Sequence, residues 1–221
     1  MSRSRIARAT GALFGVLLLA SRTAAAQNVS GGVSLAGGSY REQGPSLRFA
    51  GGGLAAHADV SYRRFALRAV MSRLTFEPET GSPAALQSFD LTQVDVALRA
   101  GVVREFGVEL GLVRRTVTPA DAAQEVGAAR LGVVASYALA PGAALTARGG
   151  YLAGARFSGG GSAPFGADLA LGVSYGPGRG RIRATGDFEF QHFARRTTVD
   201  GTRLDVPIQS AVVRLGIAVT H

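Results

Sequence analysis

A period of two runs through the sequence from Gln27 to its end and limits the chain to extended structure. In the last segment Val213, Leu215, Ile217 and Val219 alternate with small or polar side chains. Alternation places successive side chains on opposite faces of a strand, whereas a helix repeats every 3.6 residues. Similar segments recur upstream, and none shows the helical period. The sequence therefore predicts an all-β chain of ten strands, with eight as the alternative if the first hairpin is irregular.

The connections between these segments alternate in length. Short turns are expected at 63–64, 104–105, 140–142 and 176–180, and longer loops at 40–53, 74–90, 117–127, 157–165 and 196–206. In an antiparallel up-and-down arrangement, the short turns then share one rim and the long loops share the other. An even strand number with short periplasmic turns and long outer loops is typical of bacterial outer-membrane barrels. We expect residues 27–221 to form one such domain, a transmembrane β-barrel.

Alternation alone leaves open which face is inside, because a soluble barrel packs its apolar set inward. The polar face here is rich in Gly, Ala and Ser, which suits a narrow lumen. Each strand has about ten residues, the length that a tilted strand needs to cross the hydrocarbon. The aromatic residues expected to form an interfacial girdle beside the short turns are Tyr62, Phe65, Phe106, Tyr137 and Tyr175. These features favour lipid, and we predict a bacterial outer-membrane location with lipid and lipopolysaccharide as surroundings.

Residues 1–26 read as an export signal. Three Arg residues precede an apolar run at Gly11–Ala20, and Ala24, Ala25 and Ala26 follow just before Gln27. This order is that of a secretory signal peptide, and the run is too short for a membrane-spanning helix. We expect cleavage after Ala26 and transfer of residues 27–221 through the periplasm.

The end of the chain carries a specific resemblance. Residues 214–221 read RLGIAVTH, with a polar residue, Gly216 two positions later, and alternating apolar residues that include Val219. The pattern resembles the C-terminal signal of the small outer-membrane β-barrel family of bacteria, a porin-like family. His221 departs from it, because the family prefers Phe or Trp at the last position. The resemblance implies an up-and-down barrel that uses the cell's export and barrel-assembly machinery as partners.

The polar face places charges of both signs in the predicted lumen. The predicted inward-facing charges are Asp59, Arg68, Asp95, Arg99, Glu109, Arg115, Arg130, Arg148, Arg156, Asp168, Arg183, Asp187, Glu189 and Arg214. Buried charges must pair or be hydrated, and barrels near eight strands are filled by side chains. We therefore expect a salt-bridged plug with a structural or passive role. The alternative is a narrow pore whose slight Arg excess favours anions.

Few residues suggest chemistry. His57 shares a face with Asp59, His192 is expected to point toward lipid, and a His-x-Ser motif is absent, so we expect no enzyme and no catalytic residues. The sequence has no Cys, which excludes disulfides and thiolate metal sites, and we expect no metal and no cofactor. Of the net charge of +9, four Arg precede Gln27, and the remaining excess of +5, spread over many strands, is no nucleic-acid footprint. An adhesin or rim enzyme acting through the long loops stays an alternative, and the sequence leaves the oligomeric state open.

Overall fold

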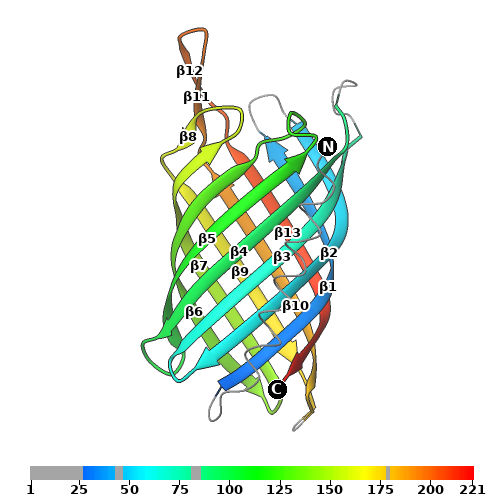
Figure 1. Ribbon diagram of the computed structural model, residues 1–221, viewed down its shortest axis with the longest axis vertical. Coiled ribbons are helices and arrows are strands. Elements are labelled where there is room, and N and C mark those ends of the chain that lie inside the picture. The colour runs from blue at the N-terminus through cyan, green and yellow to red at the C-terminus, as the bar shows by residue number, and fades with distance from the viewer. Residues whose placement is uncertain (1–26, 43–46, 81–85, 178–179) are drawn as a thin grey trace, which may run out of the picture.

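The computed structural model describes residues 27–42, 47–80, 86–177 and 180–221, which form a closed antiparallel barrel (Figure 1). The predicted signal peptide, residues 1–26, lies outside the described residues. The ten barrel strands are β1 (Gln27–Glu42), β2 (Leu47–Tyr62), β3 (Phe65–Pro78), β4 (Phe89–Gly101), β5 (Phe106–Thr118), β6 (Val126–Ala140), β7 (Ala143–Phe157), β9 (Gly166–Tyr175), β10 (Ile182–Phe193) and β13 (Ile208–Thr220). The prediction of an all-β, ten-stranded, up-and-down barrel is confirmed. Among the residues that the structure describes, no helix is long and apolar enough to cross a bilayer.

The barrel closes in two places that sequence order alone does not specify. The first strand pairs with the last, from Ser30 opposite Thr220 to Glu42 opposite Ile208. β7 pairs with β9, because the two-residue strand β8 (Ser162–Ala163) belongs to the intervening loop. Every barrel strand therefore has two antiparallel neighbours, so the backbone hydrogen bonds are satisfied within the wall.

The strands are longer than predicted at the long-loop rim. β1 reaches Glu42 and β2 begins at Leu47, so the expected loop at 40–53 is wrong. Likewise, β3 continues to Pro78, inside the expected loop at 74–90. The segment 196–206 is also more than a loop, because β11 (Arg196–Val199) and β12 (Thr202–Asp205) form a hairpin. Figure 1 shows this hairpin projecting well beyond the rim.

Side-chain exposure follows the predicted parity over the middle of the wall. In β5, Leu110 and Leu112 are 61% and 67% exposed, whereas Glu109 between Val108 and Leu110 is 1% exposed. The outer surface is therefore apolar and the lumen polar, the reverse of a soluble barrel.

A bulge in β7 overturns one assignment. Ala129 faces Ala153 and Gly127 faces Arg156, so β7 carries one extra residue around Gly154, whose φ is +63°. An extra residue in one strand moves all following side chains to the opposite face. Arg156, predicted to face the lumen, is therefore exposed, and Phe157 turns inward.

Candidate functional site

The lumen is filled at mid-height by a network centred on Arg130. Arg130 is fully buried and donates to Asp95 (2.8 Å), Asp168 (2.7 Å) and Glu109 (3.3 Å). These carboxylates come from β4, β9 and β5, while Arg130 lies on β6. One guanidinium thus links four strands of the barrel wall, and its planar fork suits several carboxylates at once.

Three further arginines complete the ion pairs of this network. Arg148 lies 2.9 Å from Asp168, and Arg99 donates to Glu109 at 2.6 Å. Arg214 donates to Asp187 at 2.6 Å and to Glu189 at 2.8 Å. We call the set the lumen network: Asp95, Arg99, Glu109, Arg130, Arg148, Asp168, Asp187, Glu189 and Arg214.

Arg115 lies in the lumen but pairs with neutral groups. Its Nη2 donates to Gln93 at 3.2 Å, to Gln191 at 2.7 Å and to Ser210 at 2.7 Å. Gln191 in turn donates to Glu189 at 2.7 Å. The amide side chains therefore connect Arg115 to the lumen network, a role that the sequence pattern did not indicate beyond their inward parity.

Three predicted lumen charges lie apart from the network, nearer the short turns. Arg68 and Asp59 are 4.0 Å apart and are both partly exposed. Arg183 donates to the carbonyl oxygen of Gly142 at 3.1 Å and belongs with the turn after β6.

An acidic trio within the network resembles a metal site in outline only. Oxygen atoms of Asp95, Asp168 and Glu189 lie within 4.8 Å of one another. Guanidinium groups already occupy the space beside them, since Arg130 contacts Asp95 and Asp168 while Arg148 lies 3.6 Å from Glu189. The trio is therefore a salt-bridged cluster in which arginines supply the positive charge.

An apolar cluster closes the lumen toward the long-loop rim. We call four of its aromatic residues, which come from β1 to β4, the aromatic cap: Tyr40, Phe49, Phe76 and Phe89, each at most 2% exposed. Phe49 and Phe89 pack edge to face at 4.9 Å between ring centroids, and Phe76 stacks on Phe89 at 5.3 Å. The Tyr40 hydroxyl donates to Glu42 at 2.6 Å. Together with Phe157, Phe193 and the aliphatic members of the buried cluster, the cap fills the lumen above the network.

The sequence pattern missed the aromatic cap, although a signal for it exists. The alternation that places Ser72 inward also places Leu74 and Phe76 inward. Extending the predicted strand β3 from Ser72 to Phe76 would therefore have placed Phe76 inside the barrel. The expected loops at 40–53 and 74–90 hid these positions.

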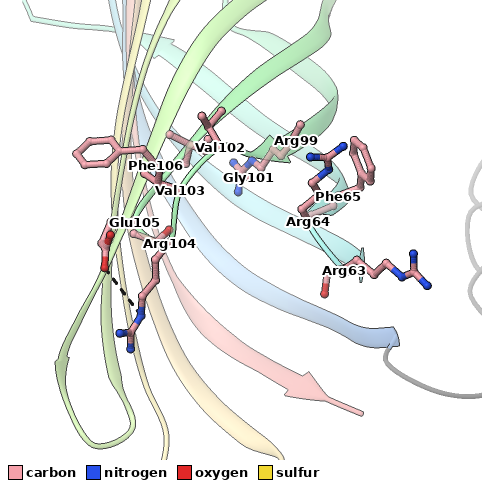
Figure 2. Close-up of a pocket in the computed structure, with 16 residues that line it drawn as sticks. Arg63, Arg64, Phe65, Arg99, Gly101, Val102, Val103, Arg104, Glu105 and Phe106 are labelled. Carbon is pink, nitrogen blue, oxygen red and sulfur yellow. Dashed lines mark ion pairs between the residues drawn. The ribbon is translucent and has the colours of Figure 1, made fainter.

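The opposite end of the lumen is hollow. An internal cavity of about 200 Å³ borders the network and is lined by His57, Arg68, Arg99 and Arg148 among others. A larger hollow of about 740 Å³, which we call the rim hollow, lies at the short-turn rim and shares Arg99 with the inner cavity. Figure 2 shows its wall, with Arg64 and Phe65 on one side and Phe106 on the other. The lumen is therefore open toward the short turns and closed toward the long loops.

The predicted girdle residues lie on the outer surface beside the short turns. Tyr62, Phe65, Phe106, Tyr137 and Tyr175 are between 44% and 61% exposed, and the rings of Phe106 and Tyr137 lie 6.2 Å apart. Aromatic rings at this height suit the boundary between hydrocarbon and headgroups.

The predicted assembly signal lies along the closing strand. Gly216 faces β1 so closely that a Cβ there would collide with the carbonyl oxygen of Val33. Val219 points outward and is 50% exposed, and the amide of His221 donates to the carbonyl of Val29 at 2.8 Å. These three residues therefore lie at the seam between the first and last strands.

The remaining histidines do not form a carboxylate couple at the long-loop rim. His57 lines the inner cavity near the short turns. His192 lies near the opposite rim, where its Nδ1 is 3.4 Å from Gln209 Nε2, so it pairs with an amide.

Comparison with known proteins identifies the fold. No protein-family model and no curated protein matches the sequence. The outer membrane protease OmpT from Escherichia coli superposes with a TM-score of 0.51 at 9% identity, covering 88% of this chain and 97% of OmpT. Neisserial surface protein A matches with a TM-score of 0.42 at 12% identity, covering 90% of this chain and 99% of its own. The outer membrane protein AlkL matches with a TM-score of 0.43 at 12% identity, covering 91% of this chain and 94% of its own.

The fold is that of the small outer-membrane β-barrels of bacteria. The band of exposed Leu, Val and Ile on a closed wall requires a hydrocarbon surrounding, and a closed barrel meets the backbone requirements of that surrounding. The protein is therefore an outer-membrane protein that crosses the bilayer with its strands.

Proposed function

We propose that the protein has a structural, non-conducting role in the outer membrane. The observation that carries this proposal is that the aromatic cap and the lumen network fill the lumen from the long-loop rim down to mid-height. Phe49, Arg130 and Asp168 are all fully buried inside the barrel. A solute that entered from the long-loop side would have to displace packed rings and then break buried ion pairs, which are costly to separate.

Electrical recording tests this proposal. The purified protein, inserted into planar bilayers, is expected to give no stepwise conductance, while flotation with liposomes verifies insertion. Discrete steps with a preference for anions would instead establish the narrow pore that the Arg excess also suggests.

The proposed role includes no catalysis. His192, the histidine near the outer rim, pairs with Gln209 rather than with a carboxylate. Neither general-base nor nucleophile activation is therefore built at that rim from these groups. Incubation of the protein with a quenched-fluorescent peptide library should release no more fluorophore than heat-unfolded protein does, and faster release would refute this part.

A second candidate function is recognition at the cell surface through the β11–β12 hairpin. The hairpin projects beyond the rim, and all four residues of β12 are exposed, including Leu204 at 42% (Figure 1). Replacing residues 197–204 by a short Gly linker is expected to spare folding and to abolish adhesion of expressing bacteria to host cells. Equal adhesion by the replaced and original proteins would exclude this function.

A further inference from the structure

The rim hollow lies between two turns of the short-turn rim. It is bounded by the β2–β3 turn at 63–64 and by the β4–β5 connection at 102–105, and it measures about 740 Å³. The amide of Gly101 donates to the carbonyl of Arg64 at 2.7 Å, which ties the two turns together. The hydrogen-bonded backbone of the two turns therefore forms the frame of the hollow, and side chains surround its opening (Figure 2).

Positive charge exceeds negative charge around the rim hollow. Its lining includes four arginines, Arg63, Arg64, Arg99 and Arg104, and a single carboxylate, that of Glu105. Glu105 lies 3.9 Å from Arg104, whose side chain is 94% exposed, and Arg99 is paired with Glu109 inside the lumen.

The two arginines of the β2–β3 turn rest on aromatic rings. The guanidinium of Arg63 lies 5.2 Å from the centroid of Tyr62, and that of Arg64 lies 5.4 Å from the centroid of Phe65. A cation over a ring keeps its hydrogen-bond donors free at the ring's edge. These two guanidinium groups therefore have donors left for an anion.

An apolar wall adjoins the charged edge. Phe65 and Phe106 line the hollow and are 44% and 50% exposed on the outer surface, and Val102 and Val103 between them are 68% and 59% exposed. Leu67 and Val108 continue this surface toward the middle of the membrane. Guanidinium groups and an apolar face thus meet at the level of the aromatic girdle.

We propose that the rim hollow binds the headgroup of an anionic phospholipid from the leaflet that borders the short turns. The lipid phosphate accepts hydrogen bonds from Arg64, since guanidinium recognises phosphate through two parallel donors, while Arg63 and Arg104 add positive charge on either side (Figure 2). Its acyl chains lie along the outer face of β3 and β5, where a soluble phosphate ester has nothing to contact. Charge complementarity and position at the bilayer interface together select a lipid.

Native mass spectrometry of the full protein tests the site. Detergent-purified protein is mixed with equal amounts of phosphatidylglycerol and phosphatidylethanolamine that carry the same acyl chains. The protein is expected to retain phosphatidylglycerol at least several-fold more often. In the variant Arg63→Gln/Arg64→Gln/Arg104→Gln this preference is expected to be lost, and heat-modifiable gel mobility verifies that the variant is folded.

Matched single variants separate a site from a diffuse positive field. Arg64→Gln removes a charge at the hollow, and Arg181→Gln removes one from another turn of the same rim. The first is expected to weaken retention of phosphatidylglycerol and the second to leave it unchanged. Equal losses in both, or no preference in the unmodified protein, would overturn the proposal.

A competition arm tests the choice of a lipid over a soluble phosphate. Glycerophosphoglycerol carries the same headgroup without acyl chains and is expected to displace phosphatidylglycerol poorly. Displacement at equal concentration would show that the apolar wall contributes nothing and would refute the lipid as occupant.

Discussion

Replacing Arg130 by Met should be among the most damaging single changes in the lumen. Arg130 has no solvent exposure and is the one cation paired with Asp95 among the described ion pairs. In the variant, Asp168 would keep its ion pair with Arg148, and Glu109 would keep its ion pair with Arg99. Removing one partner of a buried ion pair costs about 3–5 kcal/mol, because the other charge is left uncompensated. The folded-to-unfolded ratio should therefore fall about 100- to 4,000-fold.

Urea unfolding in micelles, followed by the heat-modifiable mobility of the barrel on gels, measures this loss. With a denaturant dependence of about 2 kcal/mol per molar urea, the midpoint should fall by about 2 M. Asp95→Asn, added to Arg130→Met, should restore part of the stability because it removes the unpaired charge. A measured loss below about 1 kcal/mol for Arg130→Met would refute the reasoning.

The matched control is Arg196→Met on the outer hairpin. Arg196 and Asp205 form an ion pair of 3.1 Å, but their side chains are 45% and 70% exposed. Exposed pairs contribute about 0–1 kcal/mol because water solvates both charges. The control should therefore leave the urea midpoint nearly unchanged.

Three further substitutions and one matched control test other parts of the barrel by the same urea assay. Phe89→Ala in the aromatic cap should cost about 3–5 kcal/mol, since a fully packed ring leaves a cavity. Leu110→Arg on the lipid face should cost about 2–4 kcal/mol, and a cost near zero would contradict a membrane-facing wall. Gly53→Ala should cost about 1–3 kcal/mol, because its Cβ would collide with the carbonyl oxygen of Arg73, whereas Gly127→Ala meets open space and should be tolerated.

The sequence predicts the wall of the barrel well because one physical rule governs it. Every membrane-spanning strand must present apolar groups to lipid at alternate positions, so Leu110 and Leu112 identify their face without knowledge of neighbouring strands. The rule weakens where strands leave the hydrocarbon. Residues 40–42 and 47–53 lie at the long-loop rim, and their strand structure follows from the pairing of β1 with β2, which continues to Glu42 and Leu47.

The partners inside the lumen follow from the three-dimensional register, which the sequence does not reveal. Arg115 reaches Ser210, and Arg214 reaches Ser72, across the interior rather than along neighbouring strands. Such contacts depend on the stagger of the strands around the barrel. The misplacement of Arg156 has a local cause, since a single extra residue at Gly154 reverses the parity of everything after it.

The pairing of the first strand with the last sets the order in which this molecule can be completed. Ser30 and Thr220 are paired although almost the whole polypeptide separates them in sequence. One edge of β1 therefore stays unpaired until β13 is present. Contacts this distant form late, because a very long loop must be closed first. A polypeptide halted before residue 208 would expose two unsatisfied sheet edges, which bind other chains readily. Completion of this barrel therefore depends on one event, the pairing of β1 with β13.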